Sequence, residues 1–257
     1  MAIWDDAITA RDKDVLKACG YGRVRGLGKR PALVVIDMNY NWVGDRREPV
    51  LESIKRIRHS CGEEAWDAVA VVSMLLGKAR QKQIPVIYTT GFGAEANYES
   101  RRRSWKNHRH DEDETNAYSQ RMEIVKEIAP APADILIHKP KPSGFFGTPL
   151  QSVLNDYGVD TLLVTGGSTS GCVRATVVDA FSLNYFVAVV EEGTFDRIQL
   201  SHKANLLDMN IKYADVMQAE AAGRYLDSLP ADLYEWNAGS QAQAHERKVK
   251  PQYRKAL

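Results

Sequence analysis

Short apolar runs that alternate with helical segments constrain the fold of this chain more than any other feature. The run from Pro31 to Ile36 is continuous and ends at Asp37, which is the pattern of a strand buried on both faces of a parallel sheet. Further runs of strand length follow, and helical stretches separate most of them. The predicted strands are residues 31–37, 85–90, 135–138, 161–164 and 186–190. This alternation predicts an α/β protein, a three-layer α-β-α fold on a mostly parallel, doubly wound sheet.

The remaining segments are assigned around these strands. From Val50 to Gln83 the apolar spacing predicts a helix, which Gly62 is expected to break into two pieces. Further helices are predicted at about 119–128, 148–157, 172–183 and 218–228. The domain prediction is an N-terminal arm at 1–30 with one helix at about 5–19, an α/β domain at 31–229, and a polar C-terminal tail at 230–257.

Composition argues against several kinds of partner. Lys and Arg number 34 and Asp and Glu number 33, so net charge gives no indication of a nucleic-acid or anionic-membrane partner. The apolar runs are far shorter than the roughly 20 residues of a membrane span, and the start lacks the regions of a signal peptide. Cys19, Cys61 and Cys172 fit neither a disulfide framework nor a zinc site. We expect a reduced, cytoplasmic protein in which Cys19 and Cys61 are packing residues.

Cys172 stands where a predicted strand and a loop of small residues lead into a predicted helix. Unsatisfied backbone N–H groups at such a place lower the pKa of a thiol and can bind an oxyanion. The segment alone is compatible with a nucleophile and equally with a buried structural cysteine, since free Cys is commonly buried.

Two other polar residues follow predicted strands in the same way. Asp37 and Lys139 each come directly after a strand, and ligands of doubly wound sheets bind beyond the carboxyl ends of the strands. Alone, Asp37 is more simply a turn-capping residue and Lys139 a solvated lysine. Together with Cys172 they supply a base, an electrostatic stabiliser and a nucleophile, which favours a catalytic interpretation.

These segments carry a family resemblance. Val-Val-Ile-Asp37, Ile-His-Lys139 and Thr-Ser-Gly-Cys172-Val-Arg resemble the isochorismatase-like cysteine hydrolases. The stretches 171–180 and 146–150, with Asp196-Arg197, are similar to the N-carbamoylsarcosine amidohydrolase branch of that family. The resemblance extends from about residue 20 to residue 229 and covers most of the chain, so residues 31–229 are expected to be a cysteine hydrolase domain.

The resemblance implies roles for the catalytic residues. In the family the cysteine is the nucleophile, the aspartate the base and the lysine the stabiliser, which here are Cys172, Asp37 and Lys139. It also implies a cis peptide bond between Gly167 and Ser168, with the backbone N–H groups of Ser168 and Cys172 as the oxyanion hole.

Two departures from the wider superfamily narrow the expectation. Isochorismatases proper, which hydrolyse a vinyl ether, lack the nucleophilic cysteine. Nicotinamidases carry an Asp-x-His metal motif after the second strand, whereas this chain has Thr89-Thr-Gly-Phe-Gly-Ala94 there. His108 and His110 lie in a highly charged loop and are expected to be solvated. We therefore expect neither a metal nor a cofactor.

Substrate contacts are expected from several residues. Arg197 aligns with an arginine that the branch uses to hold the substrate carboxylate, although an internal pair with Asp196 is an equal alternative. Asn39, Trp42 and Thr169 are expected to line the pocket, and Trp42 is also compatible with core packing. The long loop 91–117, with Arg101 to Arg103 and Trp105, is expected to be a lid or a subunit contact.

The resulting expectation is a cysteine-dependent amidohydrolase that cleaves the C–N bond of a small linear amide or ureide and releases ammonia through an acyl-enzyme. N-carbamoylsarcosine-type substrates come first, and maleamate-type or biuret- and triuret-type substrates are alternatives. A non-catalytic binding protein on the same fold is a further alternative, which the presence of all three triad residues disfavours. Family analogy also implies a homo-oligomer, with tetramers among its members.

Overall fold

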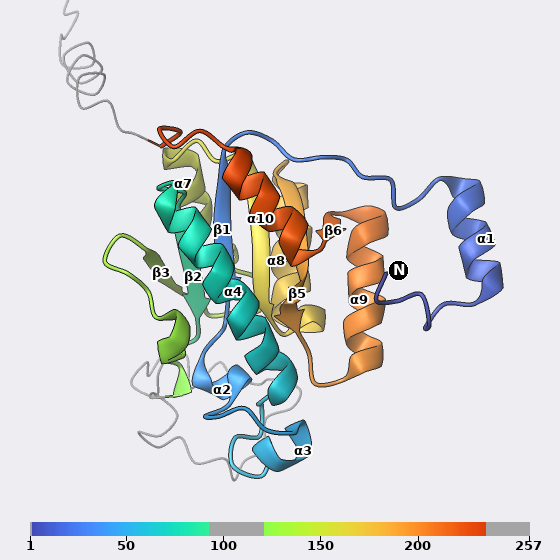
Figure 1. Ribbon diagram of the computed structural model, residues 1–257, viewed down its shortest axis with the longest axis horizontal. Coiled ribbons are helices and arrows are strands. Elements are labelled where there is room, and N and C mark those ends of the chain that lie inside the picture. Colours follow the sequence, from blue (N-terminus) through green and yellow to red (C-terminus); the bar gives the residue numbers. More distant parts are fainter. Residues whose placement is uncertain (1, 93–120, 235–257) are drawn as a thin grey trace, which may run out of the picture.

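The sheet that the sequence predicts is present in a computed structural model that describes residues 2–92 and 121–234. Six strands, all parallel, lie in the order β3-β2-β1-β4-β5-β6 (Figure 1). Their bounds are β1 Pro31–Ile36, β2 Val86–Thr90, β3 Ile135–His138, β4 Thr161–Gly167, β5 Phe186–Phe195 and β6 Asp215–Met217. The architecture is a doubly wound α/β fold, as predicted.

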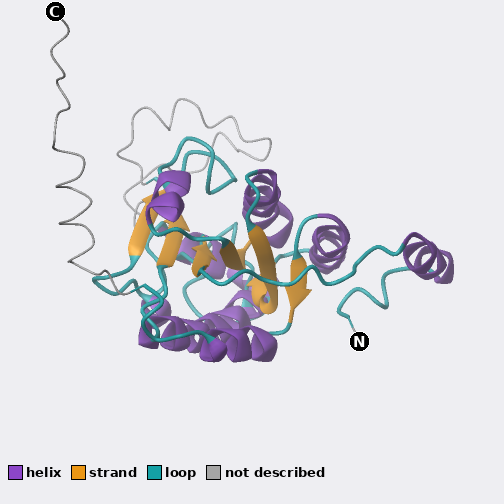
Figure 2. Ribbon diagram, turned by 90° about the horizontal axis from the view of Figure 1, so that it is seen from above, coloured by secondary structure: helices purple, strands orange, loops and turns teal. Residues whose placement is uncertain are grey.

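Helices cover both faces of the sheet and form the outer layers (Figures 1 and 2). One face packs against α4 and α10, and the other packs against α7, α8 and α9. The described helices are α1 Ala10–Cys19, α2 Tyr40–Val43, α3 Val50–Ser53, α4 Glu63–Gln81, η1 Lys126–Ile128, α7 Leu150–Asp156, η2 Thr169–Val173, α8 Arg174–Ser182, α9 Gln199–Lys212 and α10 Ala219–Ser228. None of these is long and apolar enough to cross a membrane.

Strand β1 shows why an uninterrupted apolar run was required. Ala32, Val34 and Ile36 belong to the core on one face, whereas Leu33 and Val35 belong to the core on the other. A central parallel strand has no solvent-facing side, so alternation of polar and apolar residues is absent.

The strand order reverses between β1 and β4. From β1 the chain proceeds outward through β2 to β3, then returns to the other side of β1 and proceeds through β5 to β6. At such a switch point the loops after the two central strands diverge and leave a crevice at the carboxyl edge of the sheet. The loops after β1 and β4 are those that carry Asp37 and Cys172.

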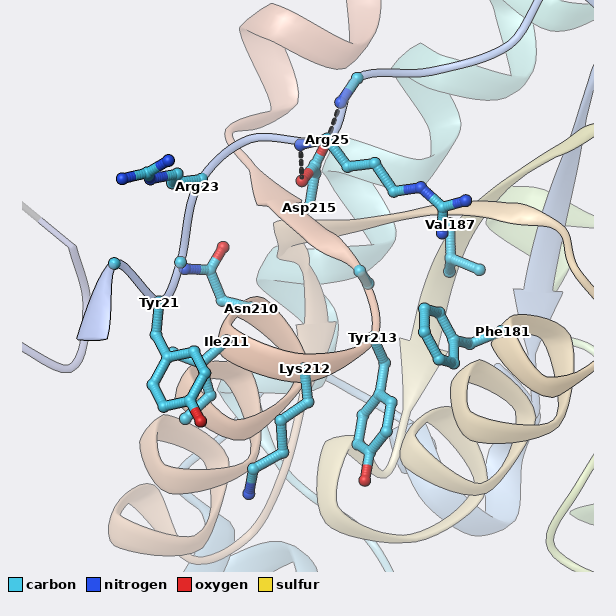
Figure 3. A pocket seen from close by; sticks show the side chains of 14 residues that line it. Tyr21, Arg23, Arg25, Phe181, Val187, Asn210, Ile211, Lys212, Tyr213 and Asp215 are labelled. Atoms are coloured by element: carbon cyan, nitrogen blue, oxygen red, sulfur yellow. Dashed lines mark hydrogen bonds between the residues drawn. The ribbon is translucent and has the colours of Figure 1, made fainter. Parts of the chain in front are cut away.

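The arm crosses the opposite, amino-terminal edge of the sheet. Helix α1 stands away from the body and has no buried residue, while Trp4 before it is buried against the core. Farther along, the backbone N–H groups of Arg25 and Gly26 donate to the carboxylate of Asp215, at 2.9 and 2.7 Å (Figure 3). Between this arm and the end of α9 lies a pocket of about 220 Å³.

Several sequence predictions of local structure need correction. In the region predicted as a helix at 119–128, residues 122–125 are not helical and residues 126–128 form the short 3₁₀ turn η1. Helix α9 and strand β6 were not predicted, because α9 has no clear apolar period and β6 is three residues long. Tyr234, which lies within the predicted tail, is buried, and its hydroxyl donates to the carbonyl of Pro31. Cys19, expected to pack, is exposed, whereas Cys61 is buried.

Candidate active site

The loop that carries Cys172 is shaped by two glycines at the end of β4. Gly166 has φ of 98°, and a Cβ atom there would lie 2.0 Å from the carbonyl oxygen of Ile36 in β1. A Cβ atom on Gly167 would lie 2.3 Å from the ring of Phe195. Small residues are therefore required for the loop to pass this close to its neighbours. The peptide bond between Gly167 and Ser168 is cis.

Cys172 itself lies in a π-helical turn, η2, which leads directly into α8. π-helical turns are rare and occur frequently at functional sites. Cys172 is 4% exposed, so it lies below the molecular surface.

Asp37 takes the position directly after β1 with a backbone that side chains rarely adopt. Its φ is 49°, in the left-handed region, while its N–H still donates to the Thr89 carbonyl of β2 at 3.0 Å. Strained residues of this kind cluster at functional sites. The turn directs the Asp37 carboxylate to the hydroxyl of Thr89, which donates to it at 2.9 Å.

The structure brings Asp37, Lys139 and Cys172 into contact. The Nζ atom of Lys139 lies 2.6 Å from Oδ2 of Asp37 and 3.3 Å from Sγ of Cys172. The Asp37 carboxylate also acts on the thiol and raises its pKa. The third donor of Lys139 goes to the carbonyl of Lys141 at 3.2 Å. All three side chains are buried, so these contacts form in a medium of low polarity.

Burial decides the resting protonation of this cluster. Desolvation, together with the neighbouring Asp37 carboxylate, raises the pKa of the Cys172 thiol to about 12. The expectation of a pKa lowered by the helix start is therefore wrong, because removal of the sulfur from water outweighs the effect of Lys139. The pKa of Lys139 is raised, since the attraction of Asp37 and Cys172 outweighs desolvation. The cluster rests as a neutral thiol beside an ammonium.

Two side chains beyond β5 and in α9 hold the nucleophile loop. The carboxylate of Asp196 accepts the backbone N–H and the hydroxyl of Ser170, at 2.9 and 2.6 Å. The hydroxyl of Thr169 donates to the carbonyl of Phe195, so Nδ1 of His202, 2.8 Å away, is the donor to that hydroxyl oxygen. Burial lowers the pKa of His202, which is therefore neutral.

The predicted substrate residue Arg197 is half-buried and its guanidinium is held by main-chain and aromatic groups. Nη1 donates to the carbonyl of His59 at 2.5 Å and contacts Sγ of Cys61 at 3.4 Å. The guanidinium carbon lies 5.1 Å from the centre of the Trp42 ring. No described carboxylate forms an ion pair with this guanidinium; Asp196 accepts the backbone N–H of Arg197 instead.

The other predicted pocket residues serve the protein itself. Asn39 is fully buried, caps α2 by accepting from the N–H of Trp42, and donates to the hydroxyl of Thr90. Thr169 is fully buried, and its hydroxyl is bonded to Phe195 and His202, so this side chain holds the loop. Trp42 is only partly buried and presents its ring to Arg197.

Residues 93–120 lie outside the described residues. They include His108, His110 and nearly all of the predicted loop 91–117. Within residues 2–92 and 121–234, no group of three or more His, Cys, Asp or Glu side chains is placed to hold a metal ion.

Sequence reasoning placed Thr89 at the same strand-end rim as Asp37, and it named Asp196 only as part of a motif and as a possible partner of Arg197. It missed His202 and Cys61 as parts of the site. The partners Asp196–Ser170 and His202–Thr169 are separated by 26 and 33 residues and have no motif spacing that would reveal them.

Comparison with known proteins now defines the class. The isochorismatase domain family matches residues 31–221. An N-carbamoylsarcosine amidase from an Arthrobacter species is 30% identical over 221 residues, which are 82% of this chain and 76% of that protein. A maleamate amidohydrolase from Pseudomonas putida is 40% identical over 106 residues, 41% of this chain and 50% of that protein.

Solved structures agree. An N-carbamoylsarcosine amidase from Thermoplasma acidophilum has a TM-score of 0.56 at 28% identity, and the match covers 74% of this chain and 97% of that one. A cysteine hydrolase from Pseudomonas syringae shares the fold, with a TM-score of 0.66 at 23% identity. The match covers 80% of this chain and 97% of that one.

The chain therefore belongs to the isochorismatase family. Within that family it is an amidohydrolase, an enzyme of the class that hydrolyses C–N bonds in linear amides.

Proposed function

We propose that this amidohydrolase uses Cys172 as its nucleophile and releases ammonia from a small linear amide or ureide of the N-carbamoylsarcosine type. The observation that carries the proposal is the buried Lys139 ammonium, which contacts both the Cys172 thiol and the Asp37 carboxylate. Nucleophile, base and stabiliser are within reach of one another before any substrate arrives.

In the first step Asp37 takes the thiol proton as the sulfur attacks the carbonyl carbon. The raised pKa of Cys172 means that the free thiolate is scarce, so proton transfer accompanies attack and does not precede it. The ammonium of Lys139 remains against the sulfur and offsets the negative charge that the sulfur gains.

The tetrahedral oxyanion needs donors other than Lys139. All three protons of that ammonium are engaged by Asp37, Cys172 and Lys141. In the loop before the nucleophile, the N–H groups of Gly171 and Ser170 are also engaged, by the Ser168 carbonyl and by Asp196. We assign the oxyanion hole to the backbone N–H groups of Ser168 and Cys172.

The reaction then completes in three proton transfers, each of which involves Asp37. Asp37 returns its proton to the nitrogen as the C–N bond breaks, so that ammonia leaves and the acyl group stays on sulfur. Asp37 next takes a proton from water, the hydroxide attacks the thioester carbonyl, and the acid departs as the sulfur recovers a proton from Asp37.

Arg197 gives the proposal its substrate class. The hydrogen bonds of its guanidinium to His59 and Cys61 both come from Nη1, and Trp42 covers one face of the group. A planar fork fixed in this way suits the two oxygens of a carboxylate. N-carbamoyl amino acids carry such a carboxylate and so does maleamate, whereas biuret and triuret do not. We therefore place N-carbamoylsarcosine-type substrates first and maleamate second.

The expectations of a cytoplasmic homo-oligomer without nucleic-acid or membrane partners stay predictions. Helix α1, which buries no side chain, is where we would seek a subunit contact, because an isolated ten-residue helix is marginal in water.

The experiment is ammonia release measured over carbamoyl amino acids, maleamate and linear ureides. We expect turnover of carboxylate-bearing substrates and a loss of at least about 10⁴-fold in Cys172→Ala. The matched control is Cys19→Ala, an exposed cysteine in the arm, which should retain full activity. Activity that survives Cys172→Ala on every substrate would rule out the thiol mechanism, and a folded protein inactive on the whole panel would favour a binding protein.

A further inference from the structure

The Asp196 carboxylate has a place in the site that the mechanism above does not use. Asp196 follows β5 directly and is 4% exposed. Its Oδ2 accepts the N–H and the hydroxyl of Ser170, and its Oδ1 accepts the backbone N–H of Arg197 at 2.8 Å. One carboxylate thus bonds both the turn that carries Cys172 and the first peptide of the segment that carries Arg197.

This carboxylate is buried without a cation beside it. Among the described residues no lysine or arginine side chain forms an ion pair with Asp196; its partners are the donors of Ser170 and Arg197. A buried charge without a counter-charge is unfavourable, and a neutral side chain would avoid that cost. The charged carboxylate forms shorter and stronger hydrogen bonds than a neutral acceptor would. The link between the two loops is therefore tighter than a neutral side chain would make it.

We propose that Asp196 is a positioning residue that fixes the separation between the Cys172 thiol and the Arg197 guanidinium. The site then selects substrates in which carboxylate and scissile carbonyl are that distance apart. The inference rests on the proposed function, in which Cys172 attacks and Arg197 holds the carboxylate. Reacting groups misplaced by about 1 Å can lose on the order of 10²-fold in rate, so a tight link of this kind matters for turnover.

Asp215 provides a matched control at the other edge of the sheet. It is also buried, and it also accepts two hydrogen bonds from backbone N–H groups, those of Arg25 and Gly26 (Figure 3). Asp196→Asn and Asp215→Asn therefore make the same chemical change in similar surroundings. Ser170→Ala removes only the hydroxyl contact to Asp196. This variant serves as the test if Asp196→Asn does not fold.

The test compares alkylation of Cys172 by iodoacetate, which carries a carboxylate, and by iodoacetamide, which does not. The rate at Cys172 is read from the mass of its peptide. We expect the wild-type protein to prefer iodoacetate, because Arg197 attracts its carboxylate toward the thiol. Asp196→Asn should lower that preference about tenfold and Ser170→Ala about threefold, while Asp215→Asn leaves it unchanged. Removal of a negative charge would by itself raise the iodoacetate rate, so a purely electrostatic effect has the opposite sign.

Three results would overturn the proposal: no preference in the wild-type protein, an unchanged or higher preference in Asp196→Asn and Ser170→Ala, or an equal loss in Asp215→Asn. The last two results differ from failure of the proposed function, which appears as ammonia release that survives Cys172→Ala; the first shows that Arg197 does not hold the carboxylate.

Discussion

At the carboxyl ends of the strands Asp37 is bonded to the ammonium of Lys139, which also contacts the Cys172 thiol, whereas at the amino ends Asp215 is bonded to the backbone N–H groups of Arg25 and Gly26. Both carboxylates are buried and both adjoin a strand end. The groups around Asp37 can exchange a proton and attack a carbonyl, while those around Asp215 can only hold the arm in place. The residue type is the same at both edges, and its neighbours decide what it does.

The pocket at the amino edge shows that a cavity alone does not indicate a catalytic site. Its 220 Å³ are lined by arm residues, by the end of α9 and by Phe181, and no Cys, Ser or His is among the lining residues. Asp215 is the carboxylate of this pocket, and Arg25 places its guanidinium over the ring of Phe186, 4.9 Å from the ring centre. A hollow without reactive neighbours is a weaker sign of catalysis than three buried groups in contact.

Replacement of either aspartate by asparagine should give the largest difference in kcat between the two edges. We expect Asp37→Asn to lower kcat about 10³-fold, because the amide cannot accept the thiol proton. Asp215→Asn should stay within about twofold of wild type. The measurement is steady-state ammonia release, with circular dichroism to confirm folding. Equal losses in the two variants would mean that the edges do not differ in the way described.

The loss of unfolding free energy should also differ between the Asp37→Asn and Asp215→Asn variants. Asp37→Asn leaves the ammonium of Lys139 buried without a counter-charge, which costs about 3–5 kcal/mol. Asp215→Asn still accepts one backbone hydrogen bond and should cost about 1–2 kcal/mol. The double variant Asp37→Asn/Lys139→Met should recover part of the first loss and none of the activity. Urea unfolding measures all three, and a double variant no more stable than Asp37→Asn would contradict a buried ion pair.

The pH dependence of Cys172 reactivity tests its surroundings. Burial and the Asp37 carboxylate raise the pKa of the thiol to about 12, so the thiolate fraction increases about tenfold per pH unit up to the alkaline limit of folding. Alkylation of Cys172 by iodoacetamide should therefore keep rising at pH values where a small thiol, with a pKa of about 8.5, has levelled off. A plateau at or below that pH would show that the thiol is not desolvated.

The smallest effect concerns Arg197. Arg197→Lys removes the planar fork but keeps the charge, and we expect KM for a carboxylate-bearing substrate to increase about tenfold with kcat nearly unchanged. A carboxylate-free ureide serves as the control substrate, and its KM should not move. If KM for the carboxylate substrate stayed the same, the role of Arg197 in carboxylate binding would be wrong.

The sheet could be predicted from the sequence because five of its strands contain a short apolar run, as Ala32 to Ile36 shows. Strand β6, by contrast, has only three residues, and nothing in Asp215–Met217 distinguishes it from a loop. Helix α9 begins with exposed Leu200 and mixes polar and apolar residues, so its apolar face becomes clear only where Leu206 and Met209 meet the core.

For the site, the sequence placed Asp37, Lys139 and Cys172 at strand ends, and topology explains why they meet there. It did not reveal that the pKa of Cys172 is raised, because desolvation depends on the packing of the whole crevice. It also did not reveal that Thr169 bonds to His202, since that contact joins residues 33 apart.

The central claim is that Cys172 forms a covalent bond to the acyl group of the substrate. The direct measurement is acid quenching during turnover of a carboxylate-bearing ureide or amide, followed by mass spectrometry of the peptide that contains Cys172. The account predicts that the Cys172 peptide gains the mass of the acyl group, and that this adduct is absent in Cys172→Ala. Turnover with an unmodified Cys172 peptide, together with ammonia release by Cys172→Ala, would contradict it.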